Sequence, residues 1–255
     1  MTADEPAVLD ASVLGTKSHW DEAYKRELNN HEHDPGDEGT IWFEDTGAEE
    51  KMIEYLENLD MEAKDLRTDG TDCSTKLRIL DVGTGNGHLL FALQESDMQA
   101  DLVGVDYSEA SVELARRIQL SRQMQQSSTD RYAHQTIRFE VCDLFSDEAH
   151  PWLDDGFDIV LDKGTFDAIS LNAAPVTSSG LAGWRTYGDR VAKLMRPGGF
   201  FLVTSCNWTE DELRKWIENP NLKFHDRVRY PSFTFGGVKG QSVSTICFRR
   251  PLDQP

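Results

Sequence analysis

The chain is poor in basic residues, poor in cysteine and without long apolar runs. It carries 26 Lys and Arg against 45 Asp and Glu, a net charge of −19. Such a charge repels phosphate backbones and anionic lipid head groups within a Debye length. No stretch approaches the roughly 20 apolar residues of a transmembrane helix. We therefore expect neither a nucleic acid nor a membrane as a direct partner.

Cysteine usage gives a second exclusion. The four cysteines, Cys73, Cys142, Cys206 and Cys247, show no CxxC spacing and no nearby histidine, and no apolar leader precedes them. These features predict a reduced compartment, which we take to be the cytoplasm with the nucleus as the alternative. The densest group of other metal ligands is His31, His33, Asp34 and Asp37, but proline and glycine interrupt it. We expect no metal site.

Short apolar runs alternate with longer amphipathic ones from residue 77 onward. The runs LRILDV, DLVGVD, IRFEVC, FDIVLD and GGFFLVTS predict strands, with helices near 87–96, 108–126, 166–172 and 184–196. This order is typical of a parallel sheet covered by helices on both faces. The segment RPGG is predicted to stop the last of these helices. Two further β-like runs, 222–230 and 242–250, are predicted to form an antiparallel terminal hairpin.

The segment before the first strand differs from the rest. Residues 1–14 lack periodicity and predict a mobile tail, whereas 15–72 predicts a helical cap and 73–251 the main domain. Residues 1–72 hold 21 acidic and 6 basic side chains. Such a run is commonly a solvated surface, and the alternative is an acidic rim that attracts a basic protein substrate.

The stretch LRILDVGTGNG carries three glycines at alternate positions after an apolar strand. Glycines there permit a tight strand-to-helix turn and a close backbone approach to a ligand. The spacing GxGxG differs from the GxGxxG of dinucleotide-binding proteins. We assign this loop to cofactor binding, with the residues Asp81, Gly83, Thr84, Gly85 and Gly87.

Two later carboxylates are placed to complete a nucleoside site. Asp106 ends the second predicted strand, where a carboxylate can accept both hydroxyls of a ribose. Asp143 follows the third strand and could accept from an adenine amino group. The neighbouring Tyr107 is predicted to pack on the base, and Leu144 is assigned to cofactor binding. Adenosine is thus implied, whether the cofactor is a dinucleotide or a sulfonium compound.

Taken together, the segments DVGTGNG, GVDYS, CDLF and FDIVLDKGTFDAI resemble the seven-β-strand S-adenosylmethionine-dependent methyltransferases. With LGTKSHWDEAY, GTIWFEDTGAEEKM and LDKGTFDAISL, the chain resembles the protein-lysine methyltransferases that modify translation elongation factor 1-alpha. The resemblance implies a single Rossmann-like α/β domain of strand order 3-2-1-4-5-7-6, with strand 7 antiparallel. It also implies a basic protein partner, and we expect the enzyme to be a monomer.

The resemblance also suggests roles at the fourth strand end, where methyl group and acceptor meet in the family. We predict that Asp162 orients the target amine, with Asp167 as the second choice. Pairing with Lys163, or capping the next helix, is the structural alternative for Asp162. Lys163 is interpreted as a salt-bridge or backbone-positioning residue. Trp20 resembles an aromatic residue that closes over the cofactor, by a cation–π contact.

Other functions remain open at this point. A small-molecule or RNA methyltransferase would share the same cofactor motifs, and the negative charge argues against RNA. A non-catalytic cofactor-binding scaffold, or an NAD-dependent oxidoreductase, would share the glycine loop alone. Binding of S-adenosylmethionine compared with NAD would separate a sulfonium-dependent protein from an oxidoreductase.

Overall fold

The computed structural model describes residues 8–65, 76–96, 98–125, 136–146, 150–172, 174, 180–230, 233–235, 238–240 and 242–252. Seven of its strands form one sheet, in the order β3-β2-β1-β4-β5-β9-β6. Their bounds are β1 Leu77–Val82, β2 Ala100–Asp106, β3 Arg138–Val141, β4 Phe157–Lys163, β5 Met195–Ser205, β6 Lys223–Val228 and β9 Ser244–Arg249. A separate pair is formed by β7 Phe233–Phe235 and β8 Val238–Gly240.

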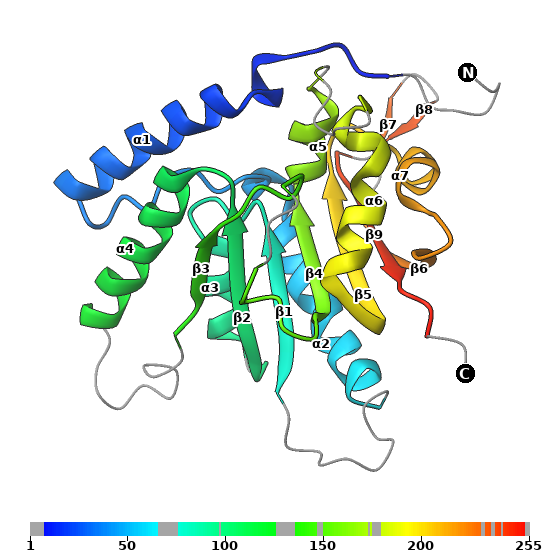
Figure 1. Ribbon diagram of the computed structural model, residues 1–255. Coiled ribbons are helices and arrows are strands. Elements are labelled where there is room, and N and C mark those ends of the chain that lie inside the picture. The colour runs from blue at the N-terminus through cyan, green and yellow to red at the C-terminus, as the bar shows by residue number, and fades with distance from the viewer. Residues whose placement is uncertain are drawn as a thin grey trace.

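The strands β1 to β5 are parallel, and β9 runs antiparallel to both β5 and β6. The predicted sheet, its strand order and its terminal antiparallel hairpin are therefore confirmed. Because the parallel strands share one direction, their carboxyl ends meet at one edge of the sheet, as Figure 1 shows. That edge is where open α/β sheets bind ligands.

Helices cover both faces of the sheet. Their bounds are α1 Lys17–His33, α2 Ala48–Asp65, α3 His88–Glu95, α4 Glu109–Gln125, α5 Thr165–Ser170, α6 Gly183–Leu194 and α7 Glu210–Ile217. One core joins α2, α3 and α4 to Leu77 and Ile79 of β1, whereas the other joins α5, α6 and α7 to Leu80 and Val82. This alternation along β1 follows from the period of two in a strand buried on both faces.

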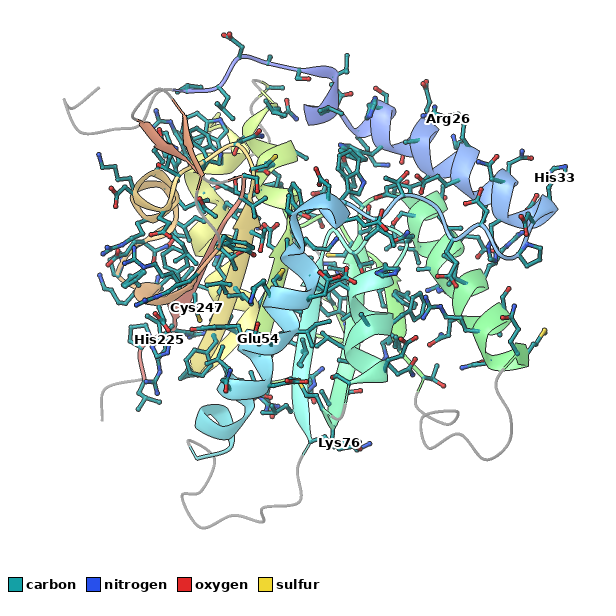
Figure 2. All side chains as sticks on the ribbon, turned by 180° about the vertical axis from the view of Figure 1, so that it is seen from behind. Arg26, His33, Glu54, Lys76, His225 and Cys247 are labelled. Carbon is teal, nitrogen blue, oxygen red and sulfur yellow. The ribbon has the colours of Figure 1, made fainter. Side chains whose placement is uncertain are left out.

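The N-terminal segment lies over the carboxyl edge of the sheet. α1 packs on α4, above the ends of the strands (Figure 1), and Arg117 and Arg122 of α4 pair with Glu32 and Glu38. Figure 2 shows Arg26 and His33 on the outer side of α1. By contrast, α2 lies on the face of the sheet. The helical segment thus consists of α1, which we call the lid helix because it lies over the strand ends, and α2, which packs in the core.

The prediction that residues 1–14 form a mobile tail does not hold for all of them. Residues 1–7 lie outside the described residues. Farther along, the Ser12 N–H donates to the Leu171 C=O at 3.1 Å, and Val13–Gly15 forms a 3-10 helix, η1. Residues from 12 onward are therefore attached to α5 at the same sheet edge.

The helix before RPGG ends two residues earlier than predicted, and RPGG itself lies within a strand. α6 ends at Leu194, and β5 already begins at Met195, which pairs with Phe157 of β4. The register then shifts before Phe200, and Gly198 takes φ +83°. A bulge of this kind lets a glycine-containing segment remain within a strand. The capping box predicted at the start of α7, between Thr209 and Glu212, is confirmed.

Candidate functional site

A cavity of about 500 Å³ opens at the carboxyl edge, between the strand ends and the N-terminal segment. Seven of the predicted site residues line it: Trp20, Gly83, Asp106, Tyr107, Asp143, Leu144 and Asp167. The other five lie behind its wall: Asp81, Thr84, Gly85, Gly87 and Asp162. The structure thus brings residues from four strand ends and α1 into one site.

The glycine loop forms the base of this cavity beside β1. Gly83 and Gly85 take φ values of +66° and +58°, which residues with a Cβ adopt rarely. A Cβ on Gly83 would stand 1.9 Å from Thr165 Oγ1, and one on Gly85 would stand 2.6 Å from the Tyr24 hydroxyl. Gly87, at φ +81°, precedes the first turn of α3. Close approach and conformation thus require glycine at both positions, and also at Gly87, where a Cβ would stand 2.8 Å from Phe139 Cζ.

Asp106 lies at the end of β2, and the protein's own hydrogen bonds use only part of the accepting capacity of its carboxylate. Its Oδ2 accepts from the Gly85 N–H at 3.1 Å, and its Oδ1 accepts from the Ser108 N–H at 2.9 Å. Burial raises the pKa of the Asp106 carboxyl, although these two hydrogen bonds oppose the shift. Since a carboxylate offers about four lone-pair sites, the carboxylate can still accept from two hydroxyls of a ligand in the cavity.

The end of β3 continues the cavity wall. Asp143 Oδ1 accepts from the Phe145 N–H at 2.9 Å. Asp143 is exposed and lines the cavity. Tyr107 is partly buried, and the Lys17 ammonium lies 5.2 Å from the centre of its ring. Leu144 and Phe145 add apolar surface to the cavity lining. This part of the site therefore combines aromatic and apolar side chains with two carboxylates, Asp106 and Asp143.

Aromatic side chains of the N-terminal segment form the opposite wall. The Trp20 ring lies 6.1 Å from that of Tyr24 and 5.3 Å from that of Trp42, and its Nε1–H donates to the Leu14 C=O at 2.7 Å. Phe43 completes the wall beside Gly164. Aromatic surface with fixed rings can hold a cationic ligand group by cation–π attraction.

Asp162 lies behind the cavity, at the base of α5. It is completely buried, and its carboxylate accepts from the N–H groups of Thr165 and Phe166 and from the Tyr187 hydroxyl. Burial raises the pKa of Asp162 to about 8, against the opposing effect of these hydrogen bonds. Its observed contacts are those of the helix-capping alternative.

Asp167 lies one turn farther along α5 and faces the cavity. Its carboxylate accepts from the Ser205 hydroxyl and from the Cys206 N–H, the latter at 2.9 Å. Burial raises the pKa of the Asp167 carboxyl, and the two donors oppose that shift. The exposed Asn207 lines the same part of the cavity. Of the two predicted acceptor-orienting residues, Asp167 is the one in position to touch a ligand.

Asp81 is the penultimate residue of β1 and does not line the cavity. It is 3% exposed, and burial raises the pKa of its carboxyl to about 7. The Thr84 N–H in the following loop donates to the Val105 C=O at 2.9 Å, so that the loop crosses onto β2. These two residues therefore support the glycine loop from behind.

Several residues that line the cavity were not predicted from the sequence. Lys17 precedes Trp20 and Tyr24 by three and seven positions, so the three share one helix face; that spacing was a usable signal. Phe43 takes φ +64°, and no residue pattern predicts that conformation for a phenylalanine. Lys163, interpreted as an ion-pairing residue, does pair with Glu49 at 3.6 Å.

Within the described ranges, no group of three or more His, Cys, Asp or Glu could hold a metal ion. Within the same residues, no helix is long and apolar enough to cross a membrane. His31 and His33 instead bond through Nδ1 to the carbonyl oxygens of Asp37 and Asn29, at 2.9 and 2.7 Å.

Comparison with known proteins agrees with this geometry. Residues 74–242 match the family model described as a methyltransferase domain. The chain is 41% identical to protein-lysine N-methyltransferase EFM4 of Saccharomyces cerevisiae, covering 95% of this chain and 96% of that protein. It is 37% identical to EEF1A lysine methyltransferase 2 of Danio rerio, covering 94% and 88%.

Solved structures resemble the chain in fold. The cyclase SpnF has a TM-score of 0.55 at 15% identity, covering 96% of this chain and all of that one. A putative class I S-adenosylmethionine-dependent methyltransferase from Listeria monocytogenes has a TM-score of 0.50 at 13% identity, covering 96% and 72%. At such low identity these structures show the fold alone. The family model and the full-length relatives go further: the chain belongs to the methyltransferase family, in the group of the protein-lysine N-methyltransferases.

Proposed function

We propose that the protein transfers a methyl group from S-adenosylmethionine to a lysine of translation elongation factor 1-alpha. The observation that carries this proposal is the match of relatives named EEF1A lysine methyltransferase 2 to 94% of the chain. That match takes in the N-terminal lid as well as the sheet domain. The substrate-facing wall is therefore included in the similarity.

The residues of the cavity fit the cofactor. Asp106 keeps accepting capacity for ribose hydroxyls, and the Cβ-free Gly83 lies next to it on the cavity floor. Tyr107 and Leu144 offer surface for a purine, and Asp143 lies exposed beside them. When bound, S-adenosylmethionine supplies an electrophilic methyl group on a sulfonium. The aromatic wall that includes Trp20 suits a positive charge.

The remaining task of the protein is to present a neutral amine. A lysine has a free pKa of about 10.4 and cannot attack while protonated. Partial desolvation in a cavity walled by Trp42 and Phe43 lowers the pKa of an entering amine. Asp167 is positioned to accept a hydrogen bond from that amine. Its own raised pKa brings this carboxyl closer to the range in which a general base works.

The charge of the chain supports a basic protein substrate. The net charge is −19, and 21 of the acidic side chains lie in residues 1–72, which include the lid. Opposite charges on two proteins raise the rate of encounter and favour the right partner. The same charge disfavours an RNA substrate.

The test is incubation of the purified protein with methyl-labelled S-adenosylmethionine and purified elongation factor 1-alpha, followed by mass spectrometry of its peptides. We expect label on a lysine of the factor, and its loss when Asp106 is changed to Ala. The control is Asp101→Ala, on the exposed start of the same strand. Label found only in added RNA, or in no macromolecule, would contradict the proposal.

A further inference from the structure

Lys163, at the end of β4, connects the sheet edge to the loop between α1 and α2. Its Nζ donates to the Trp42 C=O at 2.8 Å and lies 3.6 Å from Glu49 Oε2. The side chains of Lys163 and Glu49 are only 11% and 10% exposed. An ammonium that is mostly shielded from water keeps its charge at low cost only beside such partners.

The chain of contacts continues to the glycine loop. Glu49 Oε1 lies 2.7 Å from His88 Nδ1, in the first turn of α3. Burial alone would raise the pKa of the Glu49 carboxyl, but the hydrogen bond from His88 and the charge of Lys163 outweigh burial and lower that pKa. Lys163, Glu49 and His88 thus join three elements, β4, α2 and α3, and Lys163 of β4 also lines the cavity.

The loop held by Lys163 has an unfavourable backbone. Phe43 takes φ +64° and ψ +20°, a left-handed conformation that is uncommon for a residue with a Cβ. Its C=O accepts from the Thr46 N–H at 3.1 Å, and the Glu44 C=O accepts from the Gly47 N–H at 3.3 Å. A backbone in this state persists only when its surroundings hold it.

The ring of Phe43 is held by the residue after Lys163. A Cβ on Gly164 would stand 3.0 Å from Phe43 Cε2, so the ring lies against bare backbone. The preceding Trp42 packs edge to face on Trp20, with ring centres 5.3 Å apart. Both aromatic residues line the cavity, as do Gly164, after the end of β4, and Asp167. The position of the α1–α2 loop therefore decides the shape of the cavity where an acceptor enters.

We infer that Lys163 is a positioning residue for methyl transfer: it fixes Trp42 and Phe43 as the acceptor-side wall by holding the loop backbone and neutralising Glu49. The inference rests on the proposed function for its catalytic consequence. Its structural content, the contact of one ammonium with the Trp42 C=O and Glu49, can be tested without any methyl transfer. Lys163 is not assigned a nucleophilic role, because methyl transfer requires no covalent intermediate on the enzyme. It acts through the two aromatic residues.

The experiment compares the wild type with Lys163→Met, which keeps the length of the side chain and removes the charge, and with Lys163→Arg, which restores the charge. Lys51→Met is the matched control, because Lys51 forms an exposed pair with Glu54 on α2. Glu54 is labelled in Figure 2. Hydrogen exchange by mass spectrometry is measured on peptides covering residues 38–47 and, as a reference, β1 and β4.

In Lys163→Met, we expect the backbone amides of residues 38–47 to exchange hydrogen at least about 10-fold faster than in the wild type. The amides of β1 and β4 should keep their wild-type exchange rates. This combination is the signature of local opening. In the methylation assay, the same variant should show a KM for the protein substrate raised about 10-fold, with the Kd of S-adenosylmethionine changed by less than about 3-fold. Lys163→Arg should recover slow exchange and most of the activity. Lys51→Met should resemble the wild type throughout.

Unchanged exchange of residues 38–47 in Lys163→Met would overturn the inference. So would a uniform rise in exchange across the sheet, because that pattern indicates general destabilisation. A locally faster exchange combined with no methylation of elongation factor 1-alpha by any variant, wild type included, would refute the proposed function while supporting the loop contact. A local effect with unchanged KM and turnover would overturn the positioning role of Lys163 in methyl transfer.

Discussion

The hydroxyl of Tyr24, on the lid helix α1, lies 2.6 Å from the point where a Cβ on Gly85 would stand. The lid and the glycine loop are thus in contact across the cavity edge, although 61 positions separate the two residues in the sequence. Tyr24 is buried, and burial is the main reason that its pKa is raised well above its ordinary value. The first prediction follows from this contact.

Gly85→Ala should destabilise the protein more than Gly180→Ala does. Both glycines have positive φ, +58° and +72°, so both alanines would pay about 1–2 kcal/mol for the left-handed backbone. At Gly180 nothing lies within 4 Å of the added carbon, whereas at Gly85 the carbon meets Tyr24. Thermal melting of both variants measures the difference. Equal values of Tm would show that Tyr24 moves aside without cost.

Asp106→Ala should weaken binding of S-adenosylmethionine by more than about 1.5 kcal/mol, roughly a tenfold rise in Kd, because charge-assisted bonds to the ribose would be lost. Calorimetric titration of the folded variant gives the value. The companion Asp106→Asn retains one carbonyl oxygen and should lose less. Asp101→Ala, at the exposed start of the same strand, is the control. Wild-type affinity in a folded Asp106→Ala protein would remove Asp106 from the site.

Asp167→Asn should lower turnover by about 10²-fold while the affinity for S-adenosylmethionine stays close to that of the wild type, as for a positioned catalytic group. Its contacts to Ser205 and Cys206 make a check of Tm necessary. Asp189→Asn, exposed on α6, is the control. If Asp162→Asn instead showed the selective loss of turnover, Asp162 would be the orienting group and Asp167 a structural one.

Asp162 should make stability depend on pH. Its pKa is raised by burial from 3.8 in the unfolded chain to about 8 in the folded protein. Between these values the folded state holds a proton that the unfolded state has lost, so the free energy of unfolding falls as pH rises. Asp162→Asn cannot titrate, and its stability should vary less across this window. Its oxygen can still accept from the N–H groups of α5.

The measurement is urea unfolding of the wild type and Asp162→Asn at about pH 5 and about pH 8, with Asp189→Asn as the reference. Other buried carboxyls, among them Asp81 and Asp167, have raised pKa values and contribute a slope of the same sign. The difference between the two proteins isolates the share of Asp162. Parallel pH profiles would mean that this carboxyl titrates alike in both states.

The main sheet could be predicted from the sequence because each of its strands is a local pattern. Apolar runs such as LRILDV and FDIVLD are buried on both faces and remain recognisable without knowledge of their neighbours. The extra residues of β5 could not be predicted in this way. The bulged strand that contains Pro197 is held by long-range bonds, including that from the Gly198 N–H to the Arg250 C=O, and no local rule specifies such a pairing.

The candidate site was predictable where a residue ends a strand. Asp106 and Asp143 were found by that rule, and both line the cavity. The rule failed to separate Asp162 from Asp167, because which carboxylate faces the cavity depends on how α5 begins. The wall made by Trp42 and Phe43 was not predictable either. It depends on a contact between Lys163 and the Trp42 C=O across 121 positions.

The placement of β9 has a consequence for how the protein is made. This strand, residues 244–249, lies between β5 and β6, so an inner position of the sheet is filled by the last strand among the residues that the structure describes. Domains begin to fold while their chain is being synthesised. Here β5 must leave one edge unpaired until residue 249 has emerged from the ribosome. The nascent enzyme therefore passes through a stage with an open, aggregation-prone edge, and a chain that stops before residue 244 cannot complete the sheet.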